Sequence, residues 1–153
     1  MKVDLKKLLT ELVSKSAITA YGSASDKALT TSAAVIPLTT YDESVGKVGS
    51  DITIVNGGLR CEKTGFVLIS ARGYFTTGFT ANDLVHLVIR WQEVIDIVNC
   101  PFRIPSTYSC FSIAPQLYRV SAGSTLHLYA YNQTAARGNI SNGKLTELTV
   151  VYI

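Results

Sequence analysis

The side chains that could do chemistry in this sequence are few and widely spaced. His86 and His127 stand alone, because neither has a cysteine, aspartate or glutamate at metal-ligand spacing. Asp83, Glu93 and Asp96 could contribute to a carboxylate pair, but nothing in the sequence brings them together, so turn and edge positions are expected. No GxSxG, HExxH, P-loop or GxGxxG motif is present. We therefore expect no catalytic residue, no metal ligand and no cofactor, and we expect that the protein is not an enzyme.

The three cysteines, Cys61, Cys100 and Cys110, include no CxxC pair and cannot all pair within one chain. Cys61 and Cys110 lie inside apolar, strand-like runs, so the expected role is that of small buried hydrophobic residues. A bridge between Cys100 and Cys110 is the alternative. This cysteine usage indicates synthesis in a reducing, cytosolic compartment.

Composition narrows the class of protein. The chain has 153 residues, enough for one domain or one domain with a short appendage. Its net charge of +3 is spread thinly, with no run of Lys or Arg, so no nucleic-acid partner is expected. No stretch of about 18 apolar residues could span a membrane, and Asp4 and Glu11 interrupt any signal-peptide core. Charged residues are only 16%, too few to cover a monomer's surface well, which favours burial between subunits.

The first 34 residues predict two non-strand segments. Residues 1–14 are expected to be a helical stem or anchor, because four leucines fall on one helical face: Leu5, Leu8, Leu9 and Leu12. A helix this short needs a partner, which could be its own domain, copies of itself or another protein. Residues 15–34 are rich in Ser, Ala, Thr and Gly and predict a small-residue linker. The head domain is then expected to span residues 35–153.

The head domain is predicted to be all β. Runs rich in Thr, Val, Ile and Tyr are separated by turn residues, with no helical pattern between them. About eight short strands in this arrangement indicate an antiparallel sandwich or barrel. The expected strands lie at 51–55, 59–62, 65–75, 84–91, 93–98, 107–114, 125–132 and 145–153.

Alternation within these strands predicts two faces. The expected core face contains Val85, Leu87, Ile89, Trp91, Leu126, Leu128, Ala130, Leu148, Val150 and Tyr152. The opposite face is too aromatic or too apolar for free solvent, and such faces are typical of subunit interfaces. Coverage of that face by loops of the same chain is the alternative. The predicted interface residues are His127, Tyr129, Tyr131, Val151 and Ile153.

Two sequence runs and the closing strand carry a family resemblance. "KTGFVLISARGYF" (63–75) is similar to a Gly-x-Tyr-x-x-Ser-Ala strand, and "LYRVSAGSTLHLYAYN" (117–132) to an L-x-AG-D-x-L-x-L signature, with Ser124 where Asp is common. With the final "LTVVYI", the pattern from residue 59 onward resembles the trimeric jelly-roll heads of the complement globular-head and tumour-necrosis-factor-like superfamily. It resembles most the small versions found in bacteriophage fibres and virion appendages.

The resemblance implies an antiparallel jelly-roll sandwich that assembles as a homotrimer. It implies that the last strand is interior to a sheet near the three-fold axis, and that both chain ends lie together. The expected function is that of a phage fibre head, receptor-binding protein or capsid decoration protein. The expected location is a virion, with a virion protein bound through residues 3–14 and a host glycan or protein as target. The alternative is a bacterial trimeric glycan- or peptide-binding module, in the cytoplasm or at the cell surface.

Overall fold

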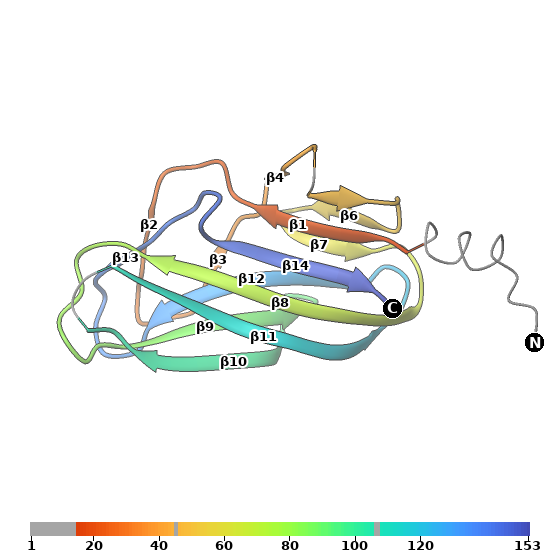
Figure 1. The fold of residues 1–153 in the computed structure, drawn as a ribbon. Helices are drawn as coiled ribbons and strands as arrows, with labels where there is room; N and C mark the ends of the chain where they lie inside the picture. Colours follow the sequence, from red (N-terminus) through yellow and green to blue (C-terminus); the bar gives the residue numbers. More distant parts are fainter. Residues whose placement is uncertain (1–14, 45, 106–107) are drawn as a thin grey trace, which may run out of the picture.

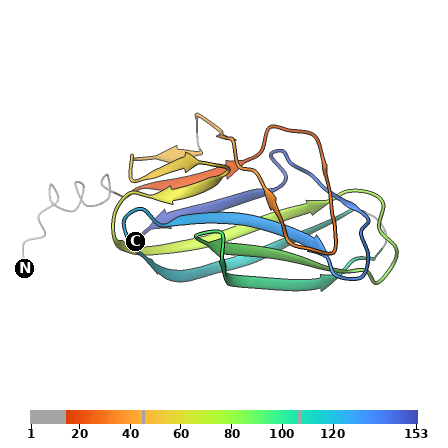
Figure 2. The same ribbon diagram turned by 180° about the vertical axis from the view of Figure 1, so that it is seen from behind.

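The computed structural model describes residues 15–44, 46–105 and 108–153. Within these residues the chain is all β, and two antiparallel sheets pack face to face (Figure 1; Figure 2 shows the reverse side). The helix predicted for residues 3–14 lies outside the described residues. The strands are β1 (Ala17–Tyr21), β2 (Lys27–Ala28), β3 (Ala34–Ile36), β4 (Thr40–Tyr41), β5 (Lys47–Val48), β6 (Ile52–Val55), β7 (Gly58–Cys61), β8 (Gly65–Phe75), β9 (Leu84–Trp91), β10 (Ile95–Arg103), β11 (Ser109–Val120), β12 (Thr125–Asn132), β13 (Asn139–Ile140) and β14 (Glu147–Tyr152).

The first sheet has the last strand, β14, in its interior. β14 pairs with β8 on one side and with β1 on the other, and β8 pairs in turn with β11. Ala17 at the start of β1 lies opposite Val151 near the end of β14, so the described chain begins and ends at the same end of the sandwich (Figure 1). The Tyr152 hydroxyl donates to the Lys63 carbonyl oxygen at 2.6 Å and fixes the end of β14. The predicted interior C-terminal strand is confirmed.

The second sheet is centred on β12. β9 pairs along one side of β12, and β3 and β7 share the other side. β10 lies beyond β9, and β6 lies beyond β7. The strands predicted at 65–75, 84–91 and 125–132 are β8, β9 and β12, with the same bounds.

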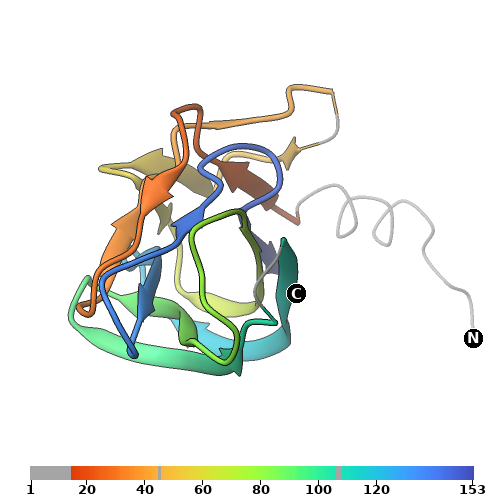
Figure 3. The same cartoon turned by 90° about the vertical axis from the view of Figure 1, so that its left-hand side faces the viewer.

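The inner faces of the two sheets form one hydrophobic core, which lies between the layers seen end-on in Figure 3. Leu87 and Ile89 of β9 and Leu128 of β12 are fully buried there, as are Ile69 of β8 and Val150 of β14. Full burial of each such side chain contributes about 1.5–3 kcal/mol. The predicted core positions are confirmed as buried, except for Trp91, which is partly buried against the core.

The small-residue segment belongs to the sandwich, so the linker predicted for residues 15–34 is wrong. β1 pairs with β14 over its whole length, and β3 pairs with β12. Ile18, Ala20 and Leu29 are at most 2% exposed. Small side chains are compatible with paired strands, and Thr19 and Thr149 form a cross-strand hydroxyl–hydroxyl contact of 2.8 Å. The predicted domain boundary at residue 35 therefore falls inside the fold.

β10 and β11 each lie at one edge of a sheet, and both run further than predicted. The expected strands ended at residues 98 and 114, before prolines, whereas β10 continues through Pro101 and β11 through Pro115. Each strand pairs along one side only, and a proline's missing N–H costs no ladder bond when it faces the open side. Both strands also carry an irregularity in register, between Asp96 and Val98 and between Ile113 and Gln116. Such features discourage edge-to-edge pairing between copies.

The cysteines are only partly as predicted. Cys61 is fully buried, and its burial raises the pKa of the thiol. Cys110 is exposed on the outer side of β11, so the prediction that it is buried is wrong. All three cysteines are free thiols, so Cys100 and Cys110 do not pair.

Candidate functional site

The five residues predicted as a subunit interface lie on two opposite surfaces. His127, Tyr129 and Tyr131 lie on the outer face of the second sheet, because they alternate with the buried Leu126, Leu128 and Ala130 of β12. Val151 and Ile153 lie on the outer face of the first sheet, at the end of β14. A single flat contact cannot use both groups.

The outer face of the second sheet holds a stack of two rings. The His86 ring lies against the Tyr131 ring, with centroids 4.3 Å apart and planes 9° from parallel. The two nitrogens of His86 lie 2.8 Å from the side-chain oxygens of Asn99 and Gln133. Both polar ends of this histidine therefore face amide side chains of the same chain, and a neutral imidazole donates to one of the two amide oxygens.

A second stack lies beside the first. The Arg90 guanidinium carbon is 4.4 Å from the centroid of the Tyr129 ring, and Tyr129 is only 9% exposed. Arg90 also forms a short hydrogen-bonded ion pair with Asp96 across the β9–β10 ladder. That hydrogen bond raises the pKa of Arg90 above its usual value. The ring and the charge are thus covered and paired within the subunit.

His127 is enclosed by its own chain as well. It is 1% exposed, and Gly58 lies so close that a Cβ there would be 2.5 Å from the imidazole. Its Nε2 lies 3.3 Å from the Glu93 carboxylate, although neither ring nitrogen makes a hydrogen bond with a described residue. Together with the two stacks, His127 completes what we call the stacked face: His86, Arg90, His127, Tyr129 and Tyr131. Side chains of neighbouring strands, rather than the loops expected in the alternative, cover much of this face.

The outer face of the first sheet is different, because apolar residues line up across five neighbouring strands. In register, Leu117 of β11 lies opposite Leu68 of β8, which lies opposite Val151 of β14. Val151 lies opposite Ala17 of β1, which lies opposite Val48 of β5. We call these five residues the apolar row.

Two further apolar residues extend the apolar row toward the chain ends. Phe66 and Ile153 lie side by side, since the Ile153 N–H donates to the Phe66 carbonyl oxygen at 3.2 Å. Their exposed fractions are 51% and 55%, and those of Leu117 and Val48 are 59% and 56%. Half of the exposed large hydrophobic residues of the described chain therefore gather on one half of one face.

The sequence signal for this row was present in "FVLI", residues 66–69. An uninterrupted apolar run in a strand places apolar side chains on both faces, and one face is the core. Phe66 and Leu68 are the residues that face outward, because Val67 and Ile69 are buried. Predicting the row also required knowing that β5 pairs with β1 and that β11 pairs with β8, which no local pattern supplies.

Polar side chains bound the apolar row on the side away from the chain ends. The next row is hydroxylated, with Thr19 and Thr149 opposite each other and Ser70 opposite Thr149. The row after it carries the ion pair between Arg72 and Glu147 at 3.3 Å. The apolar row is thus confined to the half of the sheet nearest the chain ends.

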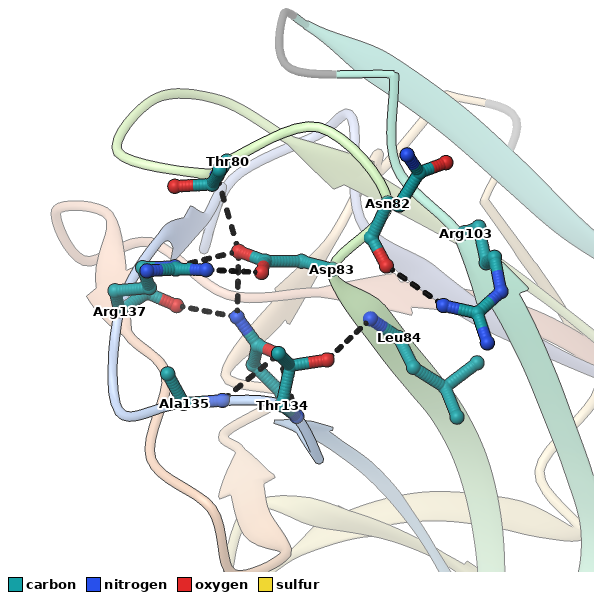
Figure 4. Close-up of polar contacts among 9 residues, drawn as sticks. Thr80, Asn82, Asp83, Leu84, Arg103, Thr134, Ala135 and Arg137 are labelled. Carbon is teal, nitrogen blue, oxygen red and sulfur yellow. Dashed lines mark hydrogen bonds and ion pairs between the residues drawn. The ribbon is translucent and has the colours of Figure 1, made fainter.

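At the opposite end of the sandwich, one buried carboxylate holds the loops together (Figure 4). Asp83 is 1% exposed and accepts hydrogen bonds from the Arg137 Nε at 2.8 Å and from the Asn132 side chain at 3.1 Å. The Thr80 N–H donates to the same carboxylate at 3.0 Å. These partners, above all Arg137, hold the pKa of Asp83 well below its usual range. The loop between β8 and β9 is therefore fixed to the loop that follows β12.

The described residues offer no cluster that resembles a metal centre, since no three His, Cys, Asp or Glu side chains converge. The same part of the chain has no helix that could span a membrane. The anchoring leucines predicted in residues 3–14 lie outside the described residues.

Comparison with known proteins supports the fold. No family model matches this sequence, and no curated protein matches it. Murine APRIL at pH 5.0 is 13% identical with a TM-score of 0.70, over 91% of this chain and 99% of that chain. Murine APRIL at pH 8.0 is 12% identical with a TM-score of 0.69 and the same coverage. The Eiger TNF structure from S. frugiperda is 13% identical with a TM-score of 0.62, over 90% of this chain and 91% of that chain.

Identities this low establish the fold alone, which is the tumour-necrosis-factor-like jelly roll that the resemblance predicted. The coverage of 91% is larger than residues 35–153 could supply, so the shared fold includes part of the segment predicted as a linker.

Proposed function

We propose that this protein is a non-enzymatic recognition module whose subunits assemble as a homotrimer through the outer face of the first sheet. The observation that carries the proposal is the apolar row, which crosses five strands and ends at the half-exposed Leu117 and Val48. In this proposal Val151 and Ile153 keep the interface role predicted from sequence. In the same proposal His127, Tyr129 and Tyr131 lie outside the contact, because neighbouring side chains of their own subunit already cover them.

The occupant of the row is proposed to be a second copy of the chain. Leu117 projects from the edge strand β11 at one margin of the face, and a hollow of about 90 Å³ lies at the other margin, lined by Ala17, Val48 and Val151. A projection and a hollow on opposite margins fit a head-to-tail contact, which closes into a ring when the rotation is three-fold. The prolines and irregularities of β10 and β11 favour this face packing over strand pairing.

Assembly through this face would remove apolar side chains from water. Four side chains of this face are half-exposed or more: Val48, Phe66, Leu117 and Ile153. Burying the exposed half of each side chain contributes on the order of 1 kcal/mol to the free energy of association. Each subunit takes part in two contacts of a trimer, and low charge elsewhere on the chain adds little repulsion.

The proposed setting is a virion, where the trimer would serve as a fibre head, receptor-binding or decoration protein. The support is the sequence resemblance to phage appendage heads, with Leu5, Leu8, Leu9 and Leu12 as the anchoring stripe. A bacterial trimeric binding module outside a virion is the second setting.

Deletion of residues 1–14 tests the anchor, because β1 begins at Ala17 and stays intact. We expect an unchanged head that no longer attaches to its carrier; a head that loses its fold would remove the anchor role.

A pair of matched substitutions tests the interface. Leu117→Asp places a charge on the apolar row, whereas Val94→Asp places one at the 80% exposed turn between β9 and β10. Neither side chain is needed by the monomer's core. Size-exclusion chromatography with light scattering should show smaller species for Leu117→Asp and wild-type mass for Val94→Asp. Wild-type mass for both variants would exclude the apolar row as the contact.

A further inference from the structure

The outer face of the first sheet also contains a depression, on the far side of the hydroxyl row from the chain ends. It encloses about 400 Å³. β1, β8 and β14 contribute to it, together with residues near Asp42 and Lys144. Its lining residues are Thr19, Tyr21, Asp42, Gly46, Arg72, Lys144, Leu145 and Glu147. We call it the mixed-charge pocket.

Four charged side chains line the mixed-charge pocket, and they form two ion pairs. Lys144 Nζ lies 3.5 Å from the Asp42 carboxylate, and Arg72 Nη2 lies 3.3 Å from the Glu147 carboxylate. Hydrogen bonds from Ser44 hold the pKa of Asp42 below its usual value, so this carboxylate is ionised at neutral pH. The two cations and two anions cancel. Asp42 also accepts from the Ser44 N–H and hydroxyl, and Arg72 Nη2 also donates to the Lys144 carbonyl oxygen, but a carboxylate offers about four acceptor positions, so hydrogen-bonding capacity remains.

Apolar surface completes the lining. The Tyr21 ring lies in the pocket, with Lys144 Nζ 5.7 Å from its centroid. Leu145 is 49% exposed at the same place. An aromatic ring and an aliphatic side chain offer a surface against which C–H groups of a ligand can pack.

This combination excludes several ligand classes. A divalent cation is not favoured, because only two carboxylates are present and both are paired with cations. A phosphate or nucleotide is not favoured, because neither cation is free and both carboxylates would repel it. A purely apolar ligand would remove four charged groups from water without new partners. A small peptide or amino acid would have to displace both internal ion pairs.

We propose that the mixed-charge pocket is a carbohydrate subsite that takes one neutral sugar unit. Neighbouring hydroxyls of the sugar donate to the free lone pairs of Asp42 and Glu147, and sugar oxygens accept from Lys144 and Arg72. The C–H face of the sugar packs against Tyr21 and Leu145. The volume falls within the 300–1,000 Å³ typical of small-ligand sites. All lining residues belong to one subunit, and the pocket lies outside the apolar row that the proposed contact uses.

The test is a titration of isotope-labelled full-length protein followed by amide NMR shifts. The probes are methyl glucoside, methyl galactoside, methyl mannoside and N-acetylglucosamine, each raised to its solubility limit, with glycylglycine as the zwitterionic comparison. At least one sugar should shift the amides of Tyr21, Gly46 and Leu145 in a saturable way. Shifts confined to other amides, shifts with glycylglycine only, or no shift with any sugar would overturn the proposal.

Two substitutions sharpen the titration. Glu147→Gln keeps the shape but loses a charged acceptor, so the affinity for the responding sugar should fall about fivefold or more. Glu62→Gln is the control, because Glu62 makes a similar exposed pair with Arg60, at 3.3 Å, in the second sheet. Equal affinity for Glu147→Gln and wild type would overturn the assignment of the subsite. Light scattering on the same samples reports assembly separately, so failure of the trimer and failure of the subsite are distinguishable.

Discussion

The outer faces of the two sheets differ in how their large side chains are satisfied. On the stacked face, Tyr131 lies against His86, and Tyr129 lies under Arg90. The apolar row has no such covering, and Leu117 at its margin is 59% exposed. The stacked face has the more aromatic sequence. The half of the first sheet that carries the apolar row nevertheless has more large hydrophobic side chains that are half-exposed.

The comparison teaches that the type of an outward residue does not by itself mark a contact surface. A tyrosine or arginine can be covered and hydrogen-bonded by neighbours of the same sheet, and it then gains little from a second subunit. Leu and Val have no polar partner to find, so their remaining exposed area can be removed only by another apolar surface.

The largest effect is expected when a charge is placed inside the apolar row. Leu68→Asp would bury an unpaired carboxylate between subunits, which costs several kcal/mol and weakens assembly by more than about a thousandfold. Tyr131→Asp on the stacked face should leave the assembly mass unchanged. Sedimentation equilibrium over a range of concentrations measures both. Monomers from Tyr131→Asp and trimers from Leu68→Asp would reverse the comparison.

The next effect concerns stability within one subunit. Tyr129→Ala removes a 9% exposed ring and uncovers Arg90, so the free energy of unfolding should fall by about 3 kcal/mol without a change in assembly. Denaturant unfolding at a fixed protein concentration measures this loss. Tyr108, 61% exposed, supplies the control: Tyr108→Ala should cost less than about 1 kcal/mol. Similar losses for both variants would show that the stacked face contributes no special stability.

The smallest expected effect concerns Asp83, which lies at the loop end of the sandwich, away from both outer faces. The folded-state pKa of Asp83 is depressed, so its stabilising contribution is present above the unfolded pKa of about 4 and is lost as the pH falls below it. Between pH 5 and pH 3 the Tm of the wild type should therefore fall a few degrees more than that of Asp83→Asn. Calorimetry across that range measures the difference. Parallel falls would mean that Asp83 is not held as a carboxylate by Arg137.

Long alternating strands were predictable from sequence because eight or more residues of one period leave little ambiguity. β8, β9 and β12 were predicted with the same bounds for this reason. The segment from Ala17 to Ile36 was missed because Ala, Ser and Thr carry weak strand signals, and its burial comes from pairing with β14 and β12. The prolines of β10 and β11 looked like strand ends, since their place at sheet edges is a property of the topology.

The contact face was harder to predict than the fold. The sequence shows that His86 and Tyr131 face outward, but not that Asn99 and Gln133 reach both nitrogens of His86. It shows that Phe66 and Leu68 alternate with core residues, but not that Leu117 lies beside Leu68. Such relations join residues far apart in the chain, so they require the strand order.

The mass of the intact protein in solution tests the central claim most directly. Multi-angle light scattering on the full chain at micromolar concentration should return about three times the chain mass of 16.5 kDa. The value should hold on moderate dilution, because the contact proposed here is mainly apolar. A mass close to 16.5 kDa over the whole concentration range would contradict the account. The apolar row would then be a surface that the protein leaves exposed to water.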